Sequence, residues 1–176
     1  MKITKFVSLL AASLLAASIF TSCGKEATEL MGFKEISADG HSYDLFVPDE
    51  WIVNTSTGIT SAYAAPDDRS NISVTSFVAS KDFSSIDALW ESTEPSLKAL
   101  YPDLEYVCNG VETTLDGAPA KEYIFTGTVN EVKYTVRQIV ALYKGDFYMF
   151  TYTAIPDKYE EHTEDIAAIL DYFTFN

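Results

Sequence analysis

The chain has 176 residues, of which 47% are hydrophobic and 14% aromatic, and a formal net charge of −14 at pH 7. This length suits one domain with its own hydrophobic core and leaves little room for two. The excess of acidic residues makes nucleic acid and anionic lipid headgroups unfavourable partners, because both are negatively charged. With 2 cysteines in the whole chain, a disulfide framework is not expected.

The first 22 residues have the parts of a bacterial export signal. Lys2 and Lys5 give a positively charged start, and residues 6–20 form an unbroken run of apolar and small residues. A helix rises about 1.5 Å per residue, so this run is well short of a hydrocarbon core of roughly 30 Å. We therefore expect residues 1–22 to be cleaved rather than to remain as a membrane span.

The signal ends with Phe20-Thr21-Ser22, directly before Cys23. This segment resembles the lipobox of bacterial lipoproteins, in which a peptidase cuts before a cysteine whose thiol carries a diacylglycerol. Phe20 departs from the pattern, because the family usually has leucine or another aliphatic residue there. Ordinary secretion, with cleavage near the small residues 16–22, is the alternative. The resemblance implies lipidation of Cys23 and a protein anchored at the outer face of the bacterial cell membrane.

The rest of the chain divides into a short tether and a single domain. Residues 23–32 are polar and lack periodicity, which is typical of a flexible tether, and residues 33–176 form the domain. Its first part is expected to hold four short strands, at residues 33–38, 42–47, 60–64 and 72–79. The first two are separated by Asp39-Gly40, a tight-turn signal that predicts a hairpin.

A helix is predicted next, because apolar residues recur at helical spacing as far as Leu100. Ser84 is its expected N-cap, and Asp87 supplies an acid in the first turn. Pro95 predicts a kink or a division into two short helices, and Pro102 ends the pattern.

The second half of the chain returns to alternation with a period of two. It predicts four consecutive antiparallel strands, at residues 104–115, 118–129, 132–143 and 147–155. The last of them has large side chains on both faces, as a central strand covered on each side requires. A terminal helix is expected to start at Asp157, with Glu160 completing a capping box, and to pack on the sheet.

These elements predict an α+β fold, with an antiparallel sheet of a meander plus N-terminal hairpins sandwiched by α-helices. The element order, with the strand segment Tyr43-Asp44-Leu45-Phe46-Val47-Pro48-Asp49-Glu50-Trp51 near its start, resembles the Mog1/PsbP-like fold over residues 33–175. More narrowly, it is similar to PsbP-related lipoproteins of gut Firmicutes. The family includes a photosystem II subunit and a nuclear transport factor that acts on a small GTPase. No residue of this sequence can be matched to either of these two functions, and the fold alone does not assign one.

Nucleophilic catalysis needs a nucleophile beside a base. Cys108 is a possible nucleophile, and His41 and His162 are the 2 histidines that could serve as its base. A single cysteine in a strand pattern is more often a small core residue, and no cysteine or histidine signature surrounds this one. The sequence therefore predicts no catalytic residue, no cofactor and no metal ligand.

Acidic and aromatic residues offer two further interpretations. Calcium could bind the acids Asp67-Asp68 or the group Glu160, Glu161, Glu164 and Asp165, but neither has the spacing of a calcium loop, so solvated surface is expected. Trp51, Trp90 and the tyrosines could line a groove for a peptide or glycan. The favoured interpretation places both tryptophans in the core and most tyrosines at the sheet edges.

The sequence thus predicts a lipid-anchored, extracytoplasmic accessory or binding module without catalytic activity and of unknown molecular role. Its expected partners are the membrane, through the lipid on Cys23, and an unidentified protein or small molecule, but not nucleic acid. The alternative is a receptor for a small ligand, peptide or glycan that uses an aromatic face of the sheet. A hydrolase-type enzyme is less favoured.

Overall fold

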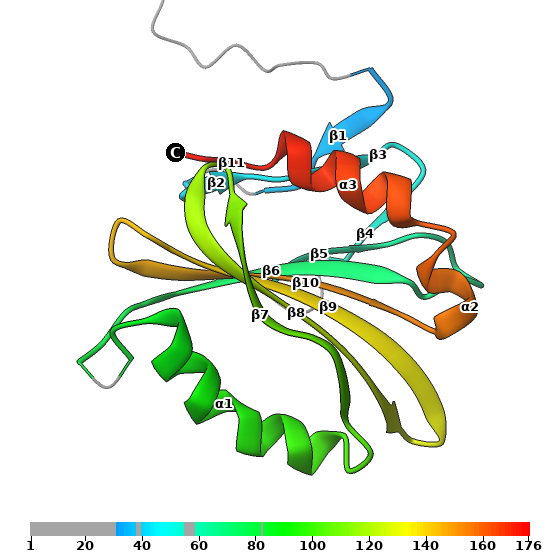
Figure 1. Cartoon of the computed structure of the whole chain (residues 1–176). Coiled ribbons are helices and arrows are strands. Elements are labelled where there is room, and N and C mark those ends of the chain that lie inside the picture. Colours follow the sequence, from blue (N-terminus) through cyan, green and yellow to red (C-terminus); the bar gives the residue numbers. More distant parts are fainter. Residues whose placement is uncertain (1–30, 38–39, 55–58, 82) are drawn as a thin grey trace, which may run out of the picture.

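The computed structural model describes residues 31–37, 40–54, 59–81 and 83–176 (Figure 1). The predicted signal, Cys23 and most of the tether lie outside these residues. At the centre is an antiparallel sheet of seven strands in the order β4-β5-β6-β10-β9-β8-β7. These strands are β4 (Ile52–Asn54), β5 (Thr60–Tyr63), β6 (Asn71–Val78), β7 (Glu105–Leu115), β8 (Ala118–Val129), β9 (Val132–Tyr143) and β10 (Asp146–Ala154).

The remaining elements lie on the two faces of this sheet. They are the short strands β1 (Phe33–Glu35), β2 (Tyr43–Asp44), β3 (Phe46–Pro48) and β11 (Thr174–Phe175), and the helices α1 (Ile86–Leu100), α2 (Pro156–Tyr159) and α3 (Thr163–Tyr172). Helix α1 packs on one face, whereas α3 and the short strands pack on the other (Figure 1). The expected helical sandwich therefore holds only in outline, because short strands supply much of the second layer.

The predicted meander is confirmed, and every strand boundary lies within one residue of its expected place. Each turn between its strands has two successive residues with positive φ, for example Asp116 at 43° and Gly117 at 72°. Such turns match the right-handed twist of the strands that they join. The last turn is centred on Lys144 and Gly145, one residue before the predicted position.

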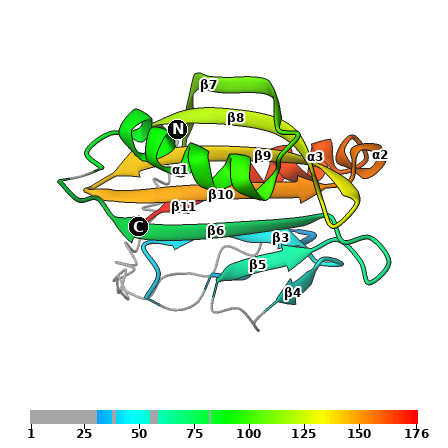
Figure 2. The same cartoon turned by 90° about the horizontal axis from the view of Figure 1, so that it is seen from below.

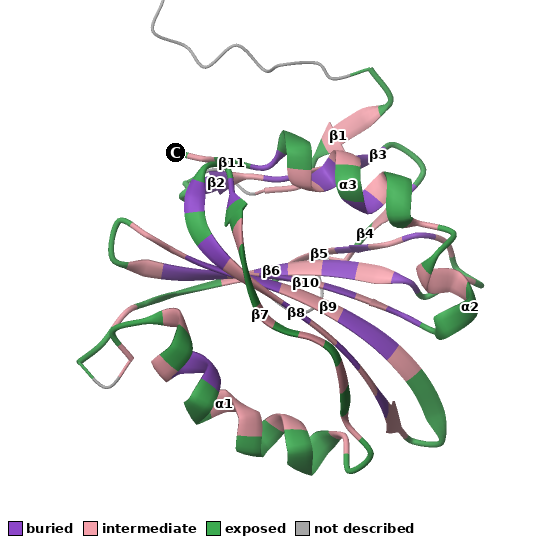
Figure 3. Cartoon of the chain, in the orientation of Figure 1, coloured by how far each residue is buried: buried purple, intermediate pink, exposed green. Residues whose placement is uncertain are grey.

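Strand β10 is the central strand that its sequence predicts. It pairs with β6 on one side and β9 on the other. Phe147 and Phe150 are both fully buried, yet they belong to different core clusters, one on each face of the sheet. Figure 3 shows the buried residues gathered along the middle of the sheet and on the inner sides of α1 and α3.

Helix α1 differs from its prediction in two details. Its N-cap is Ser85, whose Oγ accepts a hydrogen bond from the Ala88 N–H at 3.2 Å, so the predicted cap Ser84 is wrong by one residue. The helix also continues through Pro95, and the predicted division into two helices is wrong. Leu97, beyond the proline, still packs against the same core cluster, so tertiary contacts hold the segment as one helix.

The C-terminal helix also differs from its prediction. Its expected capping box is wrong, because Pro156 starts α2 and places Asp157 inside the first turn instead of at the N-cap. Residues 160–162 then separate α2 from α3. The N-terminal hairpin is confirmed only in part: β1 pairs with β3, whereas β2 pairs with β11 from the other end of the chain. No helix among the described residues has the length and hydrophobicity to cross a lipid bilayer.

A partly uncovered sheet face as a candidate binding surface

The face of the sheet that carries α1 has a covered half and an open half. Helix α1 runs across β8 and β9, whereas β6, β5 and β4 extend beyond it (Figure 2). In the covered half, Trp90 of α1 stacks on Tyr123 of β8 with the ring centroids 3.5 Å apart. Phe125 and Val140, which belong to the same cluster, are buried. The covered half is therefore an ordinary hydrophobic interface.

A row of polar side chains crosses the whole sheet on this face. Residues directly opposite each other in antiparallel strands point to the same side. The strand register joins such residues into one row, which runs Asn54, Ser61, Ser73, Thr151, Gln138, Tyr123 and Asn109. Since Tyr123 packs on Trp90, the row lies on the α1 side.

The neighbouring rows extend this polar surface. Tyr63, Asn71 and Thr153 lie in one of them, between the apolar residues Ile52 and Val136. Thr75 lies on the other side of the central row, opposite Met149. We call the following set the open face: Asn54, Ser61, Tyr63, Asn71, Ser73, Thr75, Thr151 and Thr153. All of these residues are partly exposed, and none carries a charge.

The hydroxyl groups at the centre of the open face are available to a ligand. Within the described part of the chain, the hydroxyls of Ser73, Thr75 and Thr153 make no side-chain hydrogen bond. At the boundary with the covered half, Gln138 Nε2 donates to Thr151 Oγ1 at 3.1 Å. Its carbonyl oxygen is buried and has no partner among the described residues. A hydroxyl both donates and accepts, so this surface suits ligands rich in polar groups.

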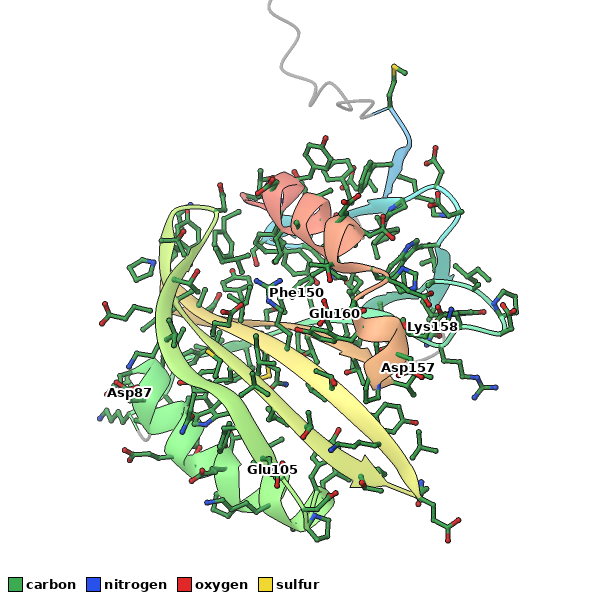
Figure 4. All side chains as sticks on the ribbon, turned by 45° about the vertical axis from the view of Figure 1, so that its right-hand side comes forward. Asp87, Glu105, Phe150, Asp157, Lys158 and Glu160 are labelled. Atoms are coloured by element: carbon green, nitrogen blue, oxygen red, sulfur yellow. The ribbon has the colours of Figure 1, made fainter. Side chains whose placement is uncertain are left out.

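Two hollows lie at the end of the open face where β6 begins. The larger, of about 490 Å³, is lined by Asn54, Tyr63, Pro66, Arg69 and Asn71. The smaller, of about 230 Å³, is lined by Asp67, Asp68, Arg69, Ser70, Tyr134, Ala154, Ile155 and Lys158. Arg69 thus contributes to both. Lys158 is on α2, well away from Asp87 on α1 (Figure 4).

The loop before β6 is held by a histidine between two carboxylates, which we call the His162 clamp (Asp68, His162 and Asp165). His162 Nε2 lies 2.9 Å from Asp68 Oδ2, and Nδ1 lies 3.2 Å from Asp165 Oδ2. The Trp51 ring meets the imidazole edge-on, with the centroids 5.5 Å apart. The Ser70 N–H also donates to Asp68 Oδ1 at 3.0 Å. These contacts fix the loop that carries Arg69 to the start of α3.

The charges within the clamp support each other. Burial of the imidazole opposes its protonation, but hydrogen bonds to Asp68 and Asp165 outweigh this and raise the pKa of His162. Burial of Asp68 alone would raise its pKa, whereas the hydrogen bonds from His162 and Ser70 lower it to about 2. The imidazolium form, with both ring N–H groups donating, is therefore favoured.

This geometry gives the clamp a positioning role. A histidine with both ring nitrogens bonded to carboxylates has no free lone pair with which to act as a base. The two carboxylates also lie at opposite nitrogens of the ring, so they do not converge on one point. No group of three or more metal-binding side chains occurs within the described residues. Of the acids that were weighed as calcium ligands and expected to be solvated, Asp68 and Asp165 thus both contact one histidine.

The structure keeps apart the other two residues that were considered as a nucleophile and its base. Cys108 is partly buried on the edge strand β7, and its thiol donates to the Glu122 carbonyl at 3.3 Å. His41 lies elsewhere, with Nδ1 3.3 Å from Thr60 Oγ1. Cys108 is thus less buried than the core residue that was predicted, because β7 is the edge strand of the sheet that the described residues form.

The predicted positions of the aromatic residues are confirmed for the tryptophans but only in part for the tyrosines. Trp51 and Trp90 are buried, at 1% and 6% exposure, as predicted. The expectation that most tyrosines lie at the sheet edges does not hold for four of the 11, because Tyr43, Tyr123, Tyr148 and Tyr152 are buried in the core. Aromatic packing on both faces of β10, and on the α1 side of β8, places these rings in the core. Tyr63 is the one tyrosine of the open face. The alternative prediction expected an aromatic groove on the sheet, whereas the uncovered surface is mainly polar.

Sequence reasoning missed the open face. The alternation of β6 places Asn71, Ser73 and Thr75 on one side and Ile72 and Val74 on the other, and this signal is present in the sequence. It does not reveal that Thr151 and Gln138 continue the row, because that depends on the pairing register. Arg69 lies in a polar turn, where the sequence gives no sign of a nearby hollow.

Comparison with known proteins establishes the fold alone. No protein-family model and no curated protein matches the sequence. CyanoP, the cyanobacterial PsbP of Synechocystis sp. PCC 6803, has 16% sequence identity and a TM-score of 0.62, and the match covers 89% of this chain and 99% of that one. LpqN of Mycobacterium tuberculosis has 18% identity and a TM-score of 0.57, covering 82% of this chain and 91% of that one.

A third solved structure extends the likeness. PA94 of Pseudomonas aeruginosa, a protein of unknown function, has 13% identity and a TM-score of 0.53, covering 82% of this chain and 97% of that one. The chain therefore has a PsbP-like fold, as its element order predicted. Since proteins with one fold carry out unrelated tasks, its function has to be argued from its own residues.

Proposed function

We propose that the protein is a lipid-anchored, extracytoplasmic binding module without catalytic activity, which holds a polar ligand on the open face. The observation that carries this proposal is the row of uncharged polar side chains that α1 leaves uncovered. Hydroxyl and amide groups on rigid strands can fix the orientation of a ligand at low entropic cost. This replaces the aromatic groove of the alternative prediction with a polar face of the same sheet.

The non-catalytic part of the proposal rests on how the reactive side chains are engaged. Both nitrogens of His162 face carboxylates, and the Cys108 thiol is bonded to a main-chain carbonyl. Neither histidine therefore stands ready as a base for the thiol among the described contacts. Turnover of any substrate by the purified domain, lost on replacing Cys108, would contradict this part.

The anchored location rests on the sequence before Cys23. Several acyl chains on one cysteine, at about 0.8 kcal/mol per buried methylene, would hold the domain at the outer face of the cell membrane. Cleavage there removes 2 lysines and no acid, which makes the mature surface still more acidic. The lipid is then the means of attachment. LpqN, which shares the fold, is involved in cell envelope biogenesis, and an envelope location for this chain is consistent with that role.

Metabolic labelling tests the anchor. Cells that express the full chain are grown with labelled palmitate, and the membrane fraction is compared for the wild type, Cys23→Ser and Cys108→Ser. Cys23→Ser should lose the label and leave the membrane, whereas Cys108→Ser should retain both. Label that persists in Cys23→Ser, or unchanged membrane fractionation of that variant, would contradict the anchor.

A blocking substitution tests the binding face. Ser73→Arg places a long charged side chain at the centre of the open face, and Ser96→Arg makes the same change at an exposed position of α1. A panel of sugars, amino acids, short peptides and metabolites is screened by thermal shift, since a ligand that binds the native state raises the melting temperature. Ligands should stabilise the wild type and Ser96→Arg but not Ser73→Arg. Equal stabilisation of both variants would contradict the proposed location.

A further inference from the structure

The charges around the open face define what it can bind. The larger hollow is lined by Arg69 together with four uncharged residues, so its described lining holds one cation and no acid. Elsewhere the chain is strongly acidic, with 26 acidic against 12 basic residues. A neutral surface with a single cation at one end is thus unusual for this molecule. Such a surface is complementary to a ligand that is mainly neutral and carries one negative group.

We propose that the open face binds an oligosaccharide that carries one uronic acid, with the acid sugar in the larger hollow and neutral sugars along the polar rows. This deepens the proposed function, on which it rests, by naming the ligand class. Arg69 would pair with the carboxylate of the sugar, and Tyr63 would support the sugar ring. The hydroxyls of Ser73, Thr75 and Thr153 would hold the ring hydroxyls.

The position of Arg69 supports the carboxylate contact. Among the described residues no ion pair engages its guanidinium, whereas the other arginine, Arg137, is 2.7 Å from Glu122. A guanidinium binds a carboxylate through two parallel hydrogen bonds, which selects for that group over a neutral hydroxyl. The His162 clamp holds the neighbouring residue Asp68, so the loop presents Arg69 from a fixed backbone.

Nearby charges indicate which hollow takes the acid. The smaller hollow contains Asp67 and Asp68, and its lysine, Lys158, is already engaged by Glu161 and lies 3.9 Å from Asp68. A ligand carboxylate would be repelled there. The larger hollow has no such acid in its described lining, so we expect Arg69 to bind the ligand carboxylate in the larger hollow. A volume of about 490 Å³ is in the usual range for small-ligand sites.

Other occupants fit the open face less well. Protein interfaces are built around buried aromatic and apolar anchors, whereas this face presents hydroxyls and amides. Phe77, the one large apolar residue of β6 on this side, lies at the far end of the strand from Arg69. Nucleic acid and polyuronates carry one charge per unit and would be repelled by the acidic domain. A ligand with a single carboxylate, bound at Arg69, is repelled much less by the acidic domain. Charges farther apart than about 8 Å are largely screened at physiological ionic strength.

Isothermal titration of the full chain in detergent with two defined probes tests the proposal. The probes are aldotetraouronic acid, a xylo-oligosaccharide with one glucuronic acid, and the neutral xylotetraose. The wild type should bind the acidic probe about tenfold more tightly, since one charge-assisted contact provides about that factor. Arg69→Gln should bind both probes equally, and Tyr63→Ala should lose both.

A matched control isolates the site from the general charge. Lys81 is exposed and lies beyond the opposite end of β6, so Lys81→Gln removes the same charge from another place and should keep the tenfold preference. Circular dichroism of each variant establishes that it is folded. Equal binding of both probes by the wild type, or a preference that survives in Arg69→Gln, would overturn the carboxylate contact. No binding of either probe would overturn the saccharide proposal, while the thermal-shift screen with Ser73→Arg still decides whether the open face binds another ligand.

Discussion

The covered and open halves belong to the same face of the same sheet, yet they have opposite chemistry. Under α1, the sheet presents Phe125, Val136 and Val140, all nearly fully buried. Beyond the helix, the same alternation presents Ser73, Thr151 and Thr153. Strand geometry is common to both halves, so the difference comes from what lies above them. The comparison indicates that the covered half provides stability, whereas the open half is free to serve a ligand.

The largest effect is expected in the covered half, for Trp90→Ala. The Trp90 ring is 6% exposed and stacks on Tyr123, so truncation leaves a large cavity between α1 and the sheet. We expect a loss of about 3–5 kcal/mol in the free energy of unfolding. Urea denaturation followed by circular dichroism measures it. A loss below about 1 kcal/mol would show that α1 contributes little to the fold.

A smaller loss is expected where α1 ends against β8. A Cβ atom at Gly127 would lie 2.7 Å from both Cβ and Cδ1 of Tyr101, the C-cap of α1. Because Tyr101 Cβ is close to its backbone, Gly127→Ala should push the end of the helix away and cost about 1–3 kcal/mol. Gly145→Ala is not a suitable control, since its φ of 92° introduces backbone strain. Ser96→Ala on exposed α1 is suitable, and stability of Gly127→Ala equal to that control would refute the close packing.

The His162 clamp predicts a pH dependence at the edge of the open half. The pKa of His162 is raised on folding, so the clamp stabilises the protein fully below the unfolded value of about 6.5 and loses this as pH rises through the folded value. Asp68 has the opposite sign, with a folded pKa of about 2, so its contribution is lost as pH falls from about 4.

His162→Gln should therefore lower the free energy of unfolding by about 1 kcal/mol near pH 5.5, and by less near pH 9. Chemical denaturation at the two pH values measures the difference. His41→Gln provides the control, because His41 has a hydroxyl partner instead of two carboxylates. A cost for His162→Gln that is independent of pH would contradict the imidazolium form.

The smallest effect on stability is expected in the open half. Ser73→Ala and Thr153→Ala remove hydroxyls that have no side-chain partner among the described residues. Each should change the free energy of unfolding by no more than about 0.5 kcal/mol, as for other exposed positions. Thermal denaturation of the two single variants tests this. A loss of more than about 2 kcal/mol would show that these hydroxyls serve the fold instead of a ligand.

Much of the fold follows from the sequence, because its strongest signals are local. The meander strands alternate over many residues, and their turns carry the residues that tolerate positive φ, such as Gly117 and Gly145. Strand β11 and its pairing with β2 were missed, since each strand has two residues and they pair across almost the whole chain. The capping box at Asp157 failed because Pro156 is an equally good local start for a helix.

The candidate site could be predicted much less well. Its residues come from β4, β5, β6 and β10, and each of them is an unremarkable polar residue in its own strand. Register joins Ser61, Ser73 and Thr151 into one row, and the length and placement of α1 decide that this row is uncovered. The partners of His162 were equally hidden, because Asp68 precedes it by 94 residues. Both features depend on tertiary structure.

The central claim is that recognition belongs to the open half, and a map of backbone amide shifts tests it most directly. Labelled protein is titrated with aldotetraouronic acid, and the shift of each assigned amide is followed by nuclear magnetic resonance. The largest chemical-shift changes should fall on Tyr63, Arg69, Asn71 and Ser73, followed by the residues of β10. The amide shifts of α1 and α3 should not change. Changes concentrated on α1 and β7, or on the α3 side of the sheet, would contradict the claim.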